Sequence, residues 1–295
     1  MNWKRDWGLT GRMWLTMFLL FVVYIVFLAV LWVLGIPSSF LILIAVGMAF
    51  IQYFFSDKLV LWSTGSRIVA EDEFPDLHRM VEKLCREADL PKPKIAIMQS
   101  PVPNAFATGR SPKHAVVACT DSIMRLLSRD ELEAVLAHEL SHVKNRDILT
   151  MTLASFVAMI ASIIMQNFLW GALFSGNNRQ GGAGAWIIAG IVAAVVWFVA
   201  NLLMMALSRY REFAADRGSG YITKNPRALI SALSKISGRM DAVPAQHKAK
   251  IEGANAFFII PALSGNALME LFSTHPALEK RIANLEKVEA ELRGY

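Results

Sequence analysis

The chain has 295 residues, of which 55% are hydrophobic and only 18% are charged. Soluble domains average about 45–50% apolar and about 25% charged residues, so this composition excludes an ordinary soluble protein and indicates membrane-spanning segments. The formal net charge is +6, but no interleaved aromatic and basic pattern accompanies it, so we expect no nucleic-acid partner. The two cysteines, Cys85 and Cys119, lack the CxxC spacing of a zinc ribbon.

Two charge-free apolar stretches, residues 13–36 and 38–55, open the chain. About 20 apolar residues cross the hydrocarbon core of a bilayer, so each stretch predicts a transmembrane helix. The second is the shorter one and contains Gln52 near its end. A re-entrant or interfacial segment is the alternative for this stretch.

The next region has the patterns of a folded soluble domain. Helical spacing of apolar residues predicts a helix over 74–88, and alternation predicts a strand over 94–98. Residues 104–108 and 114–119 flank the turn-forming segment 109–112, which is typical of a hairpin.

A capping-box pattern at Ser128 and Glu131 starts the next predicted helix, which reaches about Asn145. It can continue without a break into a third charge-free stretch, and a fourth follows. Both are long enough to span a bilayer. The fourth continues as a helix to about Ser219, and a further amphipathic helix covers 226–240. The third and fourth spans are residues 148–174 and 185–207.

These elements predict a mainly α protein with a small β-sheet, four transmembrane helices and a soluble domain. Residues 1–56 form an N-terminal transmembrane hairpin, and residues 148–207 form a second hairpin inserted into the soluble domain. That domain then consists of residues 57–147 and 208–295.

The basic residues predict the orientation in the membrane. Four spans place both termini on one side, and every lysine and arginine except Arg179 lies on that side. By the positive-inside rule this side is the cytoplasm. We therefore expect a multi-pass protein of the cell (inner or plasma) membrane, with both termini and the soluble domain cytoplasmic and the lipid bilayer as a partner.

His138-Glu139-Leu140-Ser141-His142 is an HExxH sequence on the predicted helix that starts at Ser128. Residues four apart share a helix face, so the imidazoles of His138 and His142 can bind one metal ion. Glu139 can take a proton from a water on that metal. Because zinc suits two imidazoles and a carboxylate with a fourth position for water, we predict one Zn²⁺ per chain, bound in a zincin-like catalytic domain. This catalytic domain is the soluble domain predicted above, so we expect the active site to be cytoplasmic as well.

The third ligand is predicted from depth along the spans. A metzincin continuation fails, because the chain has Asn145 and Ile148 where Gly and His are needed. His142 precedes the third span by six residues and Glu212 follows the fourth by five, so both lie about 8–9 Å from one membrane boundary. Glu212 is the predicted ligand, and Asp216 can accept the free N–H of a ligating imidazole. The alternative is a solvated acidic face paired with neighbouring arginines.

HExxH followed by a Glu-x-x-x-Asp motif, here Glu212 to Asp216, with hydrophobic spans before and between, resembles the HtpX group of membrane zinc metalloproteases. These enzymes are relatives of the CAAX prenyl proteases. The resemblance covers nearly the whole chain, including Asn104-Ala105-Phe106 and Thr274-His275-Pro276.

The resemblance implies further roles. Asn104, Ala105 and Phe106 would lie on an edge strand to which an extended substrate adds by main-chain pairing. His275 would stabilise the oxyanion, and Arg281 would support Asp216 from a helix below. From the residues alone, His275 can equally start a helix before Pro276, and Phe106 can belong to the core.

The predicted function is zinc-dependent hydrolysis of peptide bonds at the cytoplasmic membrane surface. The resemblance adds membrane-protein or unfolded polypeptide substrates, membrane-protein quality control and a link to stress. Alternatives are a prenyl-protein (CAAX-type) endopeptidase and a non-enzymatic, zinc-containing membrane adaptor. Charges on both sides of HExxH argue against a site buried within the hydrocarbon. They are Arg129, Asp130, Glu131, Glu133, Lys144, Arg146 and Asp147.

Overall fold

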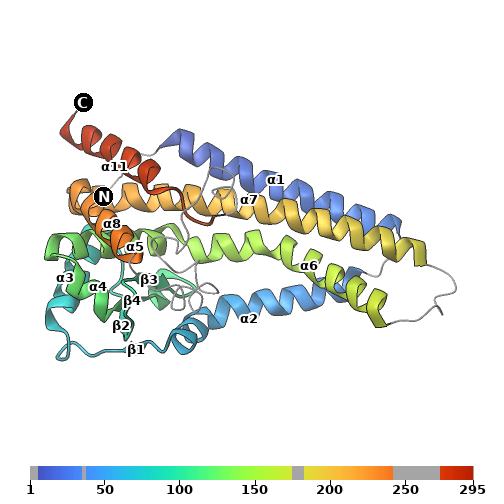
Figure 1. Cartoon of the computed structure of the whole chain (residues 1–295), viewed down its shortest axis with the longest axis horizontal. Coiled ribbons are helices and arrows are strands. Elements are labelled where there is room, and N and C mark those ends of the chain that lie inside the picture. Colours follow the sequence, from blue (N-terminus) through green and yellow to red (C-terminus); the bar gives the residue numbers. More distant parts are fainter. Residues whose placement is uncertain (1–5, 35–37, 175–182, 242–272, 295) are drawn as a thin grey trace.

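The computed structural model describes residues 6–34, 38–174, 183–241 and 273–294. Four long helices extend to one end of the molecule, while the sheet and the shorter helices gather at the other end (Figure 1). The chain is mainly helical with a small mixed sheet, as its sequence predicts. The long helices are α1 (Trp7–Val33), α2 (Ser38–Thr64), α6 (Asp147–Phe174) and α7 (Ala183–Thr223).

Helices α1, α6 and α7 are each long and apolar enough to cross a membrane. Their buried side chains, among them Phe27, Ile160 and Ala193, pack into one apolar cluster. Large apolar side chains such as Phe18 and Val195 are exposed on the outer surface of this bundle. Hydrocarbon tails solvate such groups without penalty, so the outer surface suits a lipid environment.

Helix α2 differs from the other three. Its parts Ile42–Phe55 and Asp57–Thr64 are bent by 69° relative to each other, which fits a broken span or a re-entrant loop. The described part of the chain therefore has three candidate spans, or four if α2 crosses the bilayer. The predicted crossing by residues 38–55 stays a prediction.

The shorter helices and the sheet enclose a second apolar core, which includes Leu84, Ile95, Leu136, Leu229 and Leu285. The predicted strand 94–98 and helices 74–88, 128–145 and 226–240 are confirmed, with ends that shift by at most a residue or two. The shorter helices are α3 (Pro75–Ala88), α4 (Asp121–Leu126), α5 (Arg129–Asn145), α8 (Pro226–Asp241) and α11 (Leu278–Arg293).

The sheet has the strand order β1-β2-β4-β3, so β3 lies at an edge. β3 runs antiparallel to β4, which confirms the predicted hairpin, and β2 runs parallel to β4. Gly109, just after β3, has a φ of 113°, and a Cβ there would lie 2.1 Å from the carbonyl oxygen of His114. Only glycine fits this turn. The strands are β1 (Arg67–Ile68), β2 (Lys94–Met98), β3 (Ala105–Thr108) and β4 (Val116–Thr120).

Helix α5 begins with the predicted capping box, in which Ser128 and Glu131 bond to each other's backbone. It ends at Asn145, as predicted, but it does not continue into the third span. Arg146 adopts the left-handed conformation, with φ 56° and ψ 42°, and a new helix, α6, starts at Asp147. Because one left-handed residue breaks the ladder of helical hydrogen bonds, the expected continuation into the third span is wrong.

Candidate metal centre

Helices α5 and α7 bring three potential metal ligands together. Nε2 of His142 lies 3.2 Å from Nε2 of His138 and 3.3 Å from Oε1 of Glu212. Nε2 of His138 lies 3.5 Å from Oε2 of Glu212. The three groups offer ligand atoms that all lie within 4.8 Å of one another, close enough to hold one metal ion. Glu212 therefore reaches the depth that the sequence predicts.

Asp216 contacts the ring nitrogen of His138 that is not the candidate ligand atom. Nδ1 of His138 lies 3.0 Å from Oδ1 of Asp216, and the same carboxylate accepts bonds of 2.6 and 3.0 Å from Arg281. All three side chains are buried. A proton on Nδ1, shared with a carboxylate, leaves the lone pair of Nε2 free for a metal. The structure thus brings Asp216 and Arg281 into the contacts that the sequence and the resemblance predict.

His142 has an equivalent pair that the sequence analysis missed. Nδ1 of His142 lies 2.5 Å from Oδ2 of Asp147, whose Oδ1 lies 3.1 Å from Nε of Arg211. In the sequence, Asp147 stands out only as one of the charges around HExxH. The one signal for its role is an acidic residue immediately before a charge-free span. In an unbroken helix it would point away from His142, so only the break at Arg146 reveals the contact.

The alternative of a solvated acidic face does not hold for α7. Glu212 is 5% exposed and Asp216 is 0% exposed. Of the neighbouring arginines, Arg211 pairs with Asp147, as described above, and Arg217 pairs with Glu291 at 2.9 Å. Both acidic groups of the Glu-x-x-x-Asp motif are therefore turned toward the two histidines of HExxH.

A divalent metal ion fits among these side chains. Ligands bound about 2.0–2.1 Å from a tetrahedral ion lie about 3.3 Å apart, and the ligand atoms here are 3.2, 3.3 and 3.5 Å apart. Oε2 of Glu212 is buried and accepts no hydrogen bond from any described residue. Among the described residues, the carboxylates around the site outnumber the paired guanidinium groups by two, so a divalent ion would balance the charge. These groups are Glu139, Asp147, Glu212 and Asp216, and Arg211 and Arg281.

The electrostatic setting of His142 also favours a cation. Burial alone lowers the pKa of His142, but hydrogen bonds to Asp147 and Glu212 outweigh it and raise the pKa to about 10. The surroundings of the ring therefore strongly stabilise a positive charge on or near it.

Glu139 lies beside the ligands without being one of them. Its side chain is buried, lines the same cavity and forms a hydrogen bond with the backbone of Ala107 in β3. Burial raises the pKa of Glu139, and the two neighbouring histidines oppose this effect. A raised pKa makes a carboxylate a stronger base, which suits a group that accepts a proton and later returns it.

His275 lies on the same side of the site as Glu212. Its Nδ1 is 3.1 Å from Oε2 of Glu212, and the ring is 6% exposed. Neither ring nitrogen has a hydrogen-bond partner among the described residues. An N–H of this ring is thus available to a group that enters the cavity.

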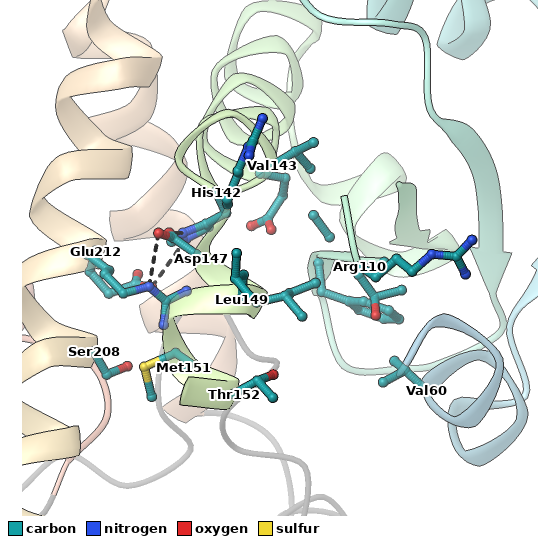
Figure 2. Close-up of a pocket in the computed structure, with 18 of the residues that line it drawn as sticks. Val60, Arg110, His142, Val143, Asp147, Leu149, Met151, Thr152, Ser208 and Glu212 are labelled. Carbon is teal, nitrogen blue, oxygen red and sulfur yellow. Dashed lines mark hydrogen bonds and ion pairs between the residues drawn. The ribbon is translucent and has the colours of Figure 1, made fainter. Parts of the chain in front are cut away.

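The cavity in front of the ligands has a volume of about 400 Å³. Figure 2 shows Glu212 and Ser208 on one wall, His142 and Asp147 in the centre, and Arg110 on the opposite wall. The cavity reaches from the metal ligands to apolar side chains of α6 and the end of α2. These include Leu149, Met151, Leu59 and Val60.

The predicted substrate strand lies along this cavity. Ala105 and Phe106 in β3 line the cavity. Asn104 joins β3 to the sheet, because its N–H donates to Thr120 Oγ1 at 2.9 Å and its carbonyl accepts from the Thr120 N–H at 2.9 Å. The Phe106 side chain is 4% exposed and packs with Val60 and Val116. Phe106 therefore belongs to an apolar cluster while its strand remains at the edge of the sheet.

The sequence of this chain is similar to those of known proteins from one family. A family model described as peptidase family M48 matches residues 71–289. The chain is 57% identical over 291 residues to Protease HtpX homolog 2 of Methanosarcina acetivorans, and the match covers 99% of both proteins. It is 54% identical over 288 residues to a Protease HtpX homolog of Moorella thermoacetica, covering 97% of this chain and 96% of that protein.

A solved structure shares the fold at lower sequence identity. The crystal structure of S. mikatae Ste24p matches with a TM-score of 0.54 and 18% identity. The match covers 92% of this chain and 66% of that longer chain. It supports the overall fold, which combines long helices with a small mixed sheet.

Proposed function

Because the chain belongs to peptidase family M48 and is a membrane metalloprotease, we propose that its metal is a single zinc ion held by His138, His142 and Glu212. The convergence of these three ligand atoms at separations of 3.2–3.5 Å carries the proposal. Three protein ligands are typical of catalytic zinc sites, whereas structural sites have four. This argues against the adaptor alternative, in which zinc would be structural.

Zinc supplies Lewis acidity, which polarises a scissile carbonyl and makes water more acidic. Glu139 takes a proton from the attacking water and passes it to the leaving amine. Its burial and its contact with Ala107 hold the carboxylate at the cavity wall. Asp216 and Arg281 keep His138 oriented, and His275 donates an N–H toward the developing oxyanion.

The substrate is a polypeptide that binds in extended form along β3. An edge strand next to the ligands supports this proposal, because a peptide can add by main-chain pairing to the free edge of the strand that follows Asn104 and contains Ala105 and Phe106. The apolar walls that α2 and α6 give to the cavity favour apolar segments. We therefore propose membrane-protein or unfolded polypeptide substrates, with membrane-protein quality control as the biological role.

The protein is proposed to be a multi-pass protein of the cell membrane, with the metal centre on the cytoplasmic side. The distribution of lysine and arginine along the sequence supports this orientation. His138 and His142 precede the candidate span that begins with α6, which starts five residues after His142, and Glu212 follows the charge-free stretch 185–207 by five residues.

The test uses the full chain purified in detergent, with zinc content and cleavage of an unfolded polypeptide as the measurements. Glu139→Gln should keep one zinc per chain and lower the cleavage rate by about 10²–10⁴-fold. Glu133→Gln is the matched control, because Glu133 lies on the same helix but pairs with Lys83, away from the ligands. This control should cleave like the wild type. Cleavage by Glu139→Gln at the wild-type rate, or a wild-type chain without zinc, would refute the proposal.

A further inference from the structure

Both histidines of HExxH are held in the same way. The Nδ1 of each ring lies against an aspartate, and each aspartate lies against an arginine. For His138 the pair is Asp216 and Arg281, with distances of 3.0 and 2.6 Å. His142 has a second such pair, formed by Asp147 and Arg211, at 2.5 and 3.1 Å.

The break between α5 and α6 allows the second pair to form. In a continuous helix, the residue five positions after His142 would be rotated by about 140° from it and would point away. The left-handed Arg146 ends α5, so Asp147 starts a new helix and its carboxylate turns back to His142. Asp147 is 2% exposed, so its side chain is buried at this junction.

The second pair connects the two long helices α6 and α7 where they meet the catalytic domain. Asp147 is the first residue of α6, and Arg211 lies on α7 next to Glu212. Helices α6 and α7 pack along each other (Figure 1). The Asp147–Arg211 contact therefore links the first residue of α6 to the turn of α7 that carries Glu212, next to His142.

We propose that Asp147 and Arg211 are a positioning pair for His142, which makes the base of the α6–α7 hairpin part of the metal centre. Asp147 fixes the Nδ1 tautomer and the ring orientation of His142. Arg211 holds the Asp147 carboxylate in place and balances its charge in a buried setting. Neither residue touches the substrate, so both act through His142.

This inference rests on the proposed zinc centre, and its test measures zinc affinity rather than cleavage. The full chain in detergent is titrated with zinc in competition with a chromophoric chelator. Asp147→Asn should weaken zinc binding by about 10–100-fold. Arg211→Gln should weaken it by about tenfold, and Arg211→Lys, which keeps the positive charge, should restore most of the affinity.

The control separates positioning from general stability. Glu291→Gln removes a carboxylate that pairs with buried Arg217 on α7 and accepts a 2.6 Å bond from Tyr221, away from the ligands. It should lower the melting temperature of the zinc-free protein and leave zinc affinity unchanged. Asp147→Asn that lowers the melting temperature but binds zinc as tightly as the wild type would overturn the inference. Absence of zinc binding by the wild type would instead refute the proposed function.

Discussion

At the scale of single residues, the buried charges around the metal ligands depend on one another. Arg281 is 2% exposed and contacts Asp216, which is fully buried, as well as Glu212 at 3.4 Å. Burial alone lowers the pKa of Arg281, but Asp216 and Glu212 outweigh this effect and raise it. The guanidinium therefore stays charged and neutralises carboxylates that would otherwise repel one another.

Removing this guanidinium should be strongly destabilising. We expect Arg281→Met to lower the free energy of unfolding by about 3–5 kcal/mol, because Asp216 is left as an unpaired buried charge. Chemical denaturation with a chelator present measures the loss without a contribution from metal. Arg293→Met on the same helix is the control, since the Arg293 side chain is 60% exposed, and it should change stability by less than about 1 kcal/mol. Equal effects of the two variants would contradict this account of Arg281.

The sequence predicts the three candidate metal ligands because their positions follow from regular geometry. Helical spacing places His138 and His142 on one face, and equal distances from the spans place Glu212 opposite them. The contact between Asp147 and His142 does not follow from any regular spacing. It depends on a left-handed residue at Arg146, which no glycine or asparagine at that position signals.

At the scale of secondary structure, the break at Arg146 should respond to backbone preference. Arg146→Gly should leave stability unchanged or raise it by up to about 1 kcal/mol, because glycine adopts positive φ freely. Arg146→Val should lower it by about 1–2 kcal/mol, because a β-branched residue resists this conformation. Thermal unfolding measures both effects. A destabilised glycine variant together with a stable valine variant would show that the left-handed turn is unimportant.

The contact between the start of α5 and α8 should make stability depend on pH. Burial alone raises the pKa of Glu131, but bonds from Lys235, Ser231 and Ser128 outweigh it and lower the pKa to about 2. A carboxylate with a lowered folded-state pKa stabilises the protein above its unfolded pKa of about 4.5. That stability is lost as the pH falls toward 2. With screening of the exposed Lys235 ammonium, the contribution is about 2 kcal/mol.

The variant Glu131→Gln isolates this effect, because glutamine can still complete the capping box with Ser128. The difference in unfolding free energy between wild type and Glu131→Gln should be largest near pH 7 and should shrink as the pH falls below 4.5. Denaturation curves at several pH values measure it. A difference that stays constant across this range would rule out the ion pair as its cause.

The regular elements are predictable from periodicity, whereas short elements and helix junctions are not. The strand 94–98 and the helix 226–240 show clear alternation or amphipathic spacing, and both form close to the predicted bounds. The two-residue strand β1 and the six-residue helix α4 carry too few residues for a period to emerge. Tertiary contacts determine such elements.

At the scale of the whole molecule, hydropathy identifies the apolar segments but not their path. Residues 38–55 are apolar enough to suggest a span, yet α2 is bent by 69° close to the end of this stretch. Composition does not encode such a bend, because it depends on how α2 packs against α6 and the sheet. The number of crossings and the side of the active site therefore require a direct topology measurement.

The two native cysteines should contribute little labelling of their own to that measurement. Burial raises the pKa of Cys85 to about 11 and that of Cys119 to about 12, so both thiols stay protonated and react slowly with maleimides. A cysteine introduced at Glu87, an exposed position on α3, reports on the catalytic domain. A cysteine at Arg179 reports on the link between the third and fourth spans, which lies outside the described residues.

With a membrane-impermeant maleimide on intact cells, we expect Arg179→Cys to be labelled and Glu87→Cys to be labelled only after lysis. In the predicted orientation the cytoplasmic side holds the other lysines and arginines, and replacing Arg179 removes the only lysine or arginine predicted on the opposite side. The substitution should therefore strengthen the orientation rather than invert it. Labelling of Glu87→Cys before lysis would place the metal centre outside the cell, and labelling of neither variant before lysis would show that the 148–207 segment does not cross the membrane as a hairpin.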